Sequence, residues 1–168
     1  GMNFGAITDV ACAPASNGIK VTWGALSGAA KYDVLRKKTT DASFTTIKTG
    51  VTTTSYVDET AASGTEYNYS VKAYHSKGYT ATTQMNAYPV GKFIAMPKLT
   101  VANTLAGIEL TINAVGGADK YVVTRTANGA STSFDVAAFS GNSYKYTDTG
   151  VAGNTAYTYS VYAQGGSI

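Results

Sequence analysis

Several residue types are nearly absent from this sequence of 168 residues, which has one cysteine, one histidine and one tryptophan. A lone Cys12 excludes an intrachain disulfide, and no set of Cys and His residues has metal-ligand spacing. No apolar run approaches the ~20 residues of a membrane span, and no glycine-rich loop of the phosphate-binding kind occurs. We therefore expect no cofactor, no metal and no membrane insertion of this chain.

Charge is also scarce. Charged residues make up 14% of the sequence, and 13 basic and 10 acidic residues spread along the chain give a net charge of +3. A nucleic-acid binder usually carries a clustered basic stripe, so nucleic acid is not an expected partner. The one basic cluster is Arg36, Lys37 and Lys38. It is either a solvated strand end that discourages edge pairing or a contact for an anionic polymer.

The sequence lacks a recognisable catalytic constellation. The single histidine, His75, precedes a predicted turn at residues 76–78, where an exposed loop residue is expected rather than a catalytic base. Asp58 and Glu59 are adjacent and would point to opposite sides of an extended strand, unlike the facing carboxylates of a glycosidase. We predict that this protein is not an enzyme.

What the sequence does contain is the pattern of β-strands. Apolar and polar residues alternate over residues 19–23 and again over residues 67–74, which places one face of each strand in a core. No comparable window has a helical period. The 18 glycines suit the turns, and the 13 tyrosines suit the strands. The sequence predicts an all-β fold.

Several segments occur twice in the same order. The matching pairs are GIKVTW (18–23) with GIELTI (107–112), KYDVLR (31–36) with KYVVTR (120–125), and YNYSVKAY (67–74) with YTYSVYA (157–163). The offset is 89 residues in the first two pairs and 90 in the third, so one residue is inserted between them. Such collinear matches indicate duplicated domains, which we assign to residues 3–90 and 91–168, with a short linker at residues 88–92.

These residues resemble a known family. A Trp in the second strand (Trp23), Tyr-x-Val in the third, and Tyr-x-Asp followed by Gly-Thr-Glu-Tyr-x-Tyr-x-Val-x-Ala resemble a fibronectin type III domain of the bacterial extracellular type. The resemblance covers both copies, although Ile112 replaces Trp23 and residues 154–157 read Asn-Thr-Ala-Tyr in the second. It implies two immunoglobulin-like β-sandwiches in tandem.

The resemblance also implies structural roles for repeated residues. Tyr67 and Tyr157 would form the tyrosine corner, in which the hydroxyl bonds to backbone just upstream and the ring packs in the core. We interpret Asp58 and Asp148 as acceptors of backbone hydrogen bonds in the turn before each corner. Ile112 takes the core position of Trp23.

The second copy ends early relative to the first. Residues 79–88 are expected to form the last strand of the first copy, and their equivalents would begin at position 169, after the last residue given. We therefore expect the second sandwich to lack its last strand. Three explanations stay open: the sequence given stops before that strand, Ala102 or neighbouring N-terminal residues of the second copy cover the edge, or two molecules pair there.

The predicted function is that of a spacer or scaffold in a larger secreted or cell-surface bacterial protein, which positions neighbouring domains or supports adhesion. Its partners would be the other domains of that protein. The alternatives are an assembly module that pairs through the open edge, and a module that binds a glycan or a host or surface protein. Tyr74, Tyr79 and Tyr162, together with the cluster Arg36, Lys37 and Lys38, are the candidate ligand contacts, while Tyr88 and Tyr144 are further tyrosines not assigned to a core.

Overall fold

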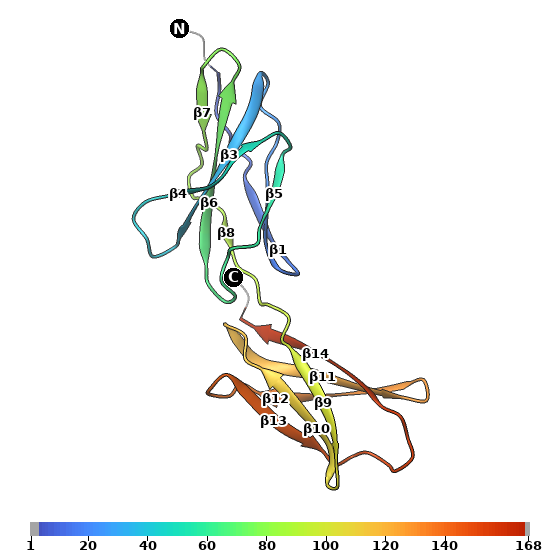
Figure 1. Ribbon diagram of the computed structural model, residues 1–168. Coiled ribbons are helices and arrows are strands. Elements are labelled where there is room, and N and C mark those ends of the chain that lie inside the picture. Colours follow the sequence, from blue (N-terminus) through green and yellow to red (C-terminus); the bar gives the residue numbers. More distant parts are fainter. Residues whose placement is uncertain (1–3, 167–168) are drawn as a thin grey trace. The chain divides into compact units, whose positions relative to one another are not determined.

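The computed structural model describes residues 4–166, and all the regular structure in that range is β-strand (Figure 1). The chain divides into two compact units between Phe93 and Ile94. We call residues 4–93 unit 1 and residues 94–166 unit 2, and describe each by itself.

Unit 1 consists of two antiparallel sheets. The smaller sheet has the order β1-β2-β5, and the larger has the order β4-β3-β6-β7, with β8 also pairing with β6. The strands of the smaller sheet are β1 (Ala11–Ala15), β2 (Gly18–Thr22) and β5 (Ser55–Asp58). Those of the larger sheet are β3 (Ala29–Lys38), β4 (Thr45–Val51), β6 (Tyr67–His75), β7 (Thr80–Thr82) and β8 (Val90–Gly91).

The core of unit 1 lies between these sheets. Ile19 and Val21 of β2 are fully buried, while Lys20 between them is exposed, which is the alternation that the sequence predicts. From the other sheet, β6 buries its residues at positions 67, 69, 71 and 73. Trp23 follows β2 and packs edge-on against Tyr32, with ring centroids 5.5 Å apart. Among the described residues its Nε1–H has no hydrogen-bond partner.

The predicted linker belongs to unit 1. Val90 and Gly91 form β8 and pair with Asn68 and Tyr67 of β6, and the carbonyl of buried Phe93 accepts a hydrogen bond from Gly64 N at 2.9 Å. A linker at residues 88–92 is therefore wrong. The unit ends three residues later than the boundary placed between residues 90 and 91, because this short strand completes the sheet.

Unit 2 repeats the plan with two three-stranded sheets, in the orders β13-β10-β9 and β12-β11-β14. The first sheet contains β9 (Leu99–Thr104), β10 (Gly107–Asn113) and β13 (Ser143–Asp148). The second contains β11 (Ala118–Ala127), β12 (Ala130–Ala137) and β14 (Thr158–Gly165). The all-β class and the tandem sandwiches are thus confirmed.

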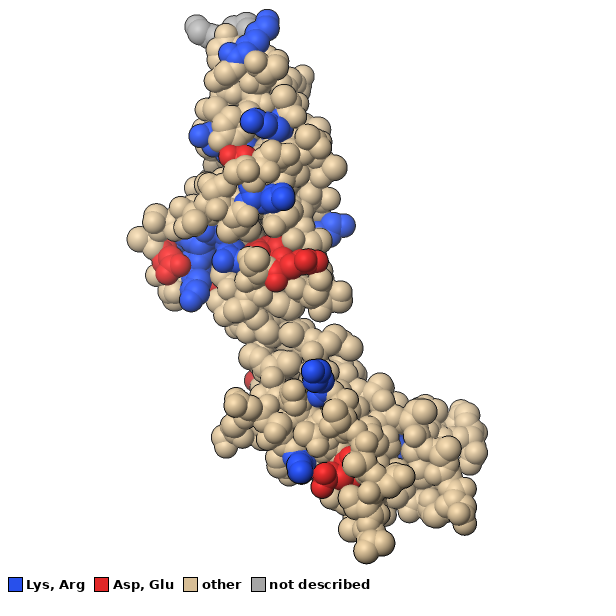
Figure 2. Space-filling model, in the orientation of Figure 1, with Lys and Arg blue, Asp and Glu red and all other residues tan. Residues whose placement is uncertain are grey.

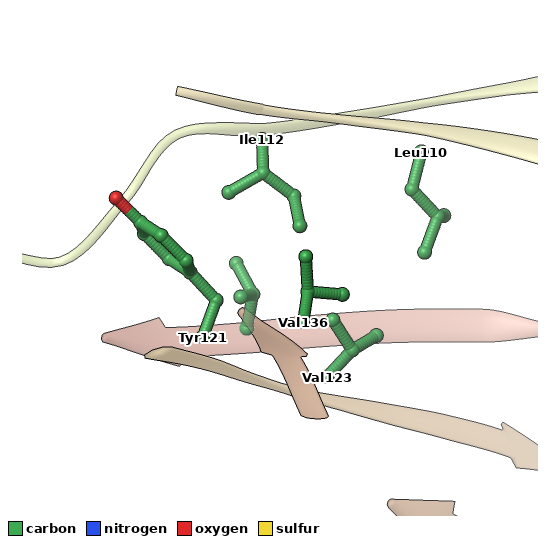
Figure 3. Packing of buried hydrophobic residues seen from close by; sticks show 6 residues of the cluster. Leu110, Ile112, Tyr121, Val123 and Val136 are labelled. Carbon is green, nitrogen blue, oxygen red and sulfur yellow. The ribbon is translucent and has the colours of Figure 1, made fainter. Parts of the chain in front are cut away.

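The core of unit 2 is built from both of its sheets. Figure 3 shows Leu110 and Ile112 of β10 facing Tyr121 and Val123 of β11, with Val136 of β12 beside them. Ile112 is fully buried, and it occupies the repeat position of Trp23. Phe139 is half-buried against this core, and its ring stacks on Tyr121 at a centroid distance of 5.1 Å.

The two units differ at one edge of the sheet that contains β6 in unit 1 and β14 in unit 2. In unit 1, β6 has β7 and β8 on its far side, whereas among residues 4–166 no strand pairs with the far side of β14. Ala102 does not cover this edge, because it lies in β9 and pairs with Glu109 in the other sheet. Ala102 itself is therefore wrong as a cover for β14, whereas Ile94, among the N-terminal residues of unit 2, has its side chain beside Gly165 of β14.

Candidate functional site

A buried carboxylate joins the two sheets of unit 1. Asp58, at the end of β5, is fully buried, and its Oδ2 accepts hydrogen bonds from the Tyr69 hydroxyl at 2.6 Å and from Arg36 Nη1 at 2.9 Å. Its Oδ1 accepts from the backbone N–H and the hydroxyl of Thr60, at 3.1 and 2.7 Å. Asp58 belongs to one sheet, and Arg36 and Tyr69 belong to the other. The cluster therefore ties the two layers of the sandwich together.

Unit 2 contains the same arrangement. Arg125 Nη1 lies 2.9 Å from both carboxylate oxygens of Asp148, and the Tyr159 hydroxyl donates to Oδ2 at 2.7 Å. The backbone N–H of Gly150 donates to Oδ1 at 3.0 Å. We call these two clusters the Arg–Asp–Tyr networks.

Strand register explains why both copies form the network. Arg36 is the cross-strand partner of Tyr69 between β3 and β6, and Arg125 is the partner of Tyr159 between β11 and β14. Cross-strand partners lie on the same face of a sheet, so both side chains turn toward the same carboxylate.

A glycine lets the strand that carries each aspartate come close. A Cβ on Gly18 would lie 2.2 Å from the carbonyl oxygen of Asp58, and one on Gly107 would lie 2.3 Å from that of Asp148. Because these separations are well inside van der Waals contact, a side chain at either position would push the aspartate-bearing strand away. The repeated Gly-Ile pair at the start of GIKVTW and GIELTI thus has a structural cause.

The electrostatics of the networks favour the ionised carboxylates. Burial alone would raise the pKa of Asp58, but hydrogen bonds from Tyr69, Thr60 and Arg36 outweigh it and hold that pKa below its ordinary value. Burial would also raise the pKa of Asp148, but hydrogen bonds from Tyr159, Arg125 and Gly150 outweigh it and lower that pKa. Burial and the carboxylate raise the pKa of both tyrosines, most strongly that of Tyr69, so these hydroxyls stay protonated as donors.

These shifts predict an acid-dependent loss of stability. The pKa of Asp58 is lower in the folded state than in the unfolded state. The ionised carboxylate therefore adds its full contribution to the free energy of unfolding above the unfolded pKa of about 4. That contribution is lost as the pH falls through the lower folded-state pKa. We expect the difference in unfolding free energy between the wild type and Asp58→Asn to stay constant from about pH 7 to 5 and to shrink below about pH 4. Urea denaturation followed by Trp23 fluorescence measures it, and a difference independent of pH would contradict the assignment.

A second repeated contact adjoins each network. The Tyr67 hydroxyl accepts a hydrogen bond from Ala62 N at 2.9 Å, and the Tyr157 hydroxyl accepts one from Ala152 N at 2.8 Å. This is the tyrosine-corner geometry that the resemblance implies. The guanidinium of Arg36 lies 4.6 Å from the centroid of the Tyr67 ring, so the corner and the network share one arginine.

The candidate ligand tyrosines lie in different surroundings. The Tyr74 hydroxyl donates to Asp33 at 2.8 Å, and the Nζ atoms of Lys31 and Lys72 lie 5.4 and 5.2 Å from the centre of its ring. Tyr79 is exposed and packs edge-on against His75. Tyr162 is an exposed residue of β14 in unit 2. The structure therefore does not gather Tyr74 and Tyr79 into one platform.

The three residues of the basic cluster lie in different surroundings, because successive side chains of β3 point to opposite faces of the sheet. Arg36 belongs to the network of unit 1, while Lys37 Nζ donates to the carbonyl of Asp41 at 3.0 Å and lies 5.6 Å from the centre of the Phe44 ring. Lys38 is exposed. All three border a hollow of about 170 Å³ that also touches Asp41 and Tyr67. Lysine and arginine side chains are visible together with acidic ones on this part of unit 1 in Figure 2.

The remaining reactive side chains have structural contacts. Nδ1 of His75 accepts a hydrogen bond from Lys77 N at 3.0 Å, and its ring lies edge-on to those of Phe4 and Tyr79. Burial raises the pKa of the Cys12 thiol to about 12, which keeps it protonated at neutral pH. Within residues 4–166, no group of His, Cys, Asp or Glu has the geometry of a metal site, and no helix could cross a membrane.

Two features were missed by sequence reasoning. The Arg–Asp–Tyr networks had a signal in the repeat, because Arg36 and Arg125, like Tyr69 and Tyr159, occupy equivalent positions in the two copies. The second feature is a hollow of about 830 Å³ in unit 1, lined by Thr8 and residues 83–88. Residues 79–88 are predicted to be one continuous strand, and a continuous strand would leave no such hollow.

Comparison with known proteins agrees with this architecture. No family model and no curated protein sequence matches the chain. Among solved structures, an Fn3-like protein from Clostridium thermocellum is 31% identical, with a match that covers 94% of that chain and 56% of this one, at a TM-score of 0.46. The chicken interferon gamma receptor alpha chain is 15% identical over 95% of this chain and 89% of its own, at a TM-score of 0.52. A segment of two fibronectin type III domains from chicken tenascin is 16% identical over 95% of this chain and 91% of its own, at a TM-score of 0.47.

Proposed function

We propose that this chain, which belongs to the fibronectin type III family, is a non-catalytic spacer or scaffold that positions other domains of a larger protein or supports adhesion. This proposal rests on the observation that ionised side chains of each unit bind to other side chains of the same unit. In each unit an arginine, an aspartate and a tyrosine hydrogen-bond to one another between the two sheets. Groups held in this way stabilise the sandwich and are not presented to a substrate.

We place the parent protein outside the cell or on the surface of a bacterium. The 31% identical relative is bacterial, which supports the source. Both units form their cores without a disulfide, because Cys12 is the only cysteine, so folding does not depend on oxidation in the compartment. The partners of a spacer are the domains on either side of it in the parent chain.

Exchange of the module in the parent protein tests this role. Replacing the chain with two fibronectin type III domains of unrelated surface is expected to preserve the activity or adhesion of the flanking domains. Replacement by a flexible Gly/Ser linker of equal residue number is expected to reduce it, since such a linker behaves as a random coil and fixes no distance. Cell adhesion or the activity of the flanking domains is the readout.

The opposite pattern would contradict the proposal. If the unrelated domains abolish function as completely as the linker does, a specific surface of this chain is needed, and recognition of a host or surface protein would replace spacing as its role.

A further inference from the structure

The hollow beside residues 83–88 arises from an interruption of the last strand of unit 1. Eight residue steps separate Thr82 from Val90, whereas only four separate their partners Lys72 and Asn68 on β6. The four surplus residues leave the sheet between β7 and β8. They form one wall of the hollow of about 830 Å³, and Thr8 of the N-terminal segment lies on another side.

The first residues of the segment that leaves the sheet, Thr83 and Gln84, are held by hydrogen bonds. Thr83 is buried, and its hydroxyl accepts from Val71 N at 2.8 Å and donates to Val71 O at 3.1 Å, so the side chain replaces part of the strand ladder. Gln84 N then donates to the carbonyl of Ile7 at 2.9 Å, which fixes the N-terminal segment next to it. The hollow is therefore part of the folded unit.

An exposed aromatic ring borders the hollow and is held in position. Tyr88 is 38% exposed, and its ring lies edge-on to Phe44 with centroids 4.7 Å apart. The side-chain amide of Asn68 donates long hydrogen bonds to the carbonyls of Tyr88 and Pro89, at 3.5 and 3.4 Å. A ring that is fixed while still exposed loses little conformational entropy when a ligand stacks on it.

The chemistry of the lining is polar and uncharged. Gln84 and Asn86 contribute amides, Thr8 contributes a hydroxyl, and Met85 is an exposed apolar side chain. Of the residues that the structure describes, no Lys, Arg, Asp or Glu lines the hollow. The side chains of Thr8, Gln84 and Asn86 are exposed to solvent. Amides both donate and accept, which suits the hydroxyl groups of a sugar, and the aromatic ring suits its apolar face.

We propose that this hollow binds a neutral saccharide, with Tyr88 as the stacking ring and Gln84 and Asn86 as the hydrogen-bonding groups. The hollow is open to solvent, with a volume of about 830 Å³, so a bound saccharide would lie along the surface against Tyr88 and stay largely exposed. The uncharged lining favours a neutral saccharide over an acidic one, because no Lys or Arg among the described residues of the hollow would neutralise a carboxylate or sulfate.

Titration of the isotopically labelled chain with neutral oligosaccharides tests the proposal. The probes are six-unit oligomers of glucose, mannose, xylose and N-acetylglucosamine, and hexagalacturonate is the acidic comparison. At least one neutral oligomer is expected to give saturable NMR shifts at Thr8 and residues 83–88 at concentrations up to about 10 mM. Tyr88→Ala is expected to weaken that binding at least about tenfold, and Asn86→Ala several-fold.

The chain offers a matched control. Tyr79→Ala removes a tyrosine of the same unit and nearly the same exposure, 40%, that does not line the hollow, and it is expected to leave affinity unchanged. Tyr88→Phe keeps the stacking ring and should retain most of the affinity, which separates a binding role from a folding role. The absence of saturable binding by all four neutral oligomers, unchanged affinity in Tyr88→Ala, or tighter binding of hexagalacturonate would overturn the proposal. None of these outcomes affects the spacer role, which the module exchange tests separately.

Discussion

Asp58→Ala is expected to destabilise unit 1 by about 3–5 kcal/mol, which is the usual cost of removing one partner from a buried ion pair. The substitution leaves the Arg36 guanidinium without its counter-charge and the buried Tyr69 hydroxyl without its acceptor. Because the carboxylate joins two sheets, its loss weakens the packing of both layers. Trp23 is the only tryptophan of the chain and is buried in unit 1, so urea denaturation followed by its fluorescence reports this unit alone.

Two aspartates serve as controls for Asp58→Ala. Asp33 accepts from the Tyr74 hydroxyl at 2.8 Å and from Gly50 N at 3.2 Å on the outer face of the larger sheet. Asp33→Ala is expected to cost about 1 kcal/mol, because water replaces both lost bonds. Asp148→Ala should leave the Trp23 transition unchanged, since its network lies in unit 2. A similar loss for Asp33→Ala and Asp58→Ala would contradict the special role of the buried network.

The two β-sandwiches can be predicted from the sequence, because the patterns that indicate them are local and occur in both copies. Strand alternation over residues 19–23 and 67–74 indicates which faces are buried, and the second copy repeats each segment with the same spacing. The tyrosine corner follows for the same reason, since Tyr67 and the backbone of Ala62 are only five residues apart.

The networks depend on contacts that local patterns do not contain. Arg36 stands beside Lys37 and Lys38 in the sequence, which groups the three as one basic cluster. On a strand, however, successive side chains point to opposite faces, so Arg36 turns toward Asp58 in the other sheet while Lys37 faces outward. Only the pairing of β3 with β6, together with the approach of β5, shows that Arg36 has a buried partner.

The hollow at Tyr88 results from a shift in the pairing register between β6 and the strands β7 and β8. The prediction of a strand over residues 79–88 rests on their position after the strand at residues 67–74, and that position does not reveal the four surplus residues that leave the sheet before β8. The same surplus places the predicted linker residues Val90 and Gly91 back in the sheet. A register shift of this kind is set by the partner strand, so it becomes visible only when both strands are placed.

The largest effect in unit 2 is expected from its core. Leu110→Ala removes a fully buried side chain from a core that also includes Ile112 and Val123, and it is expected to cost about 2–5 kcal/mol, because lost burial and the remaining cavity both destabilise. Leu105→Ala is a matched control, since this leucine lies between β9 and β10 and is fully exposed, and the same atoms removed there should cost less than about 0.5 kcal/mol.

Amide hydrogen exchange of β10 and β11 measures the stability of unit 2 directly, while Trp23 fluorescence follows unit 1 in the same samples. Leu110→Ala should accelerate exchange in β10 and β11 and leave the Trp23 transition unchanged, because each unit has a core of its own. Equal effects of Leu110→Ala and Leu105→Ala would contradict the packing in Figure 3. A shift of the Trp23 transition would instead show that the two units unfold together, which would make the module a single mechanical element.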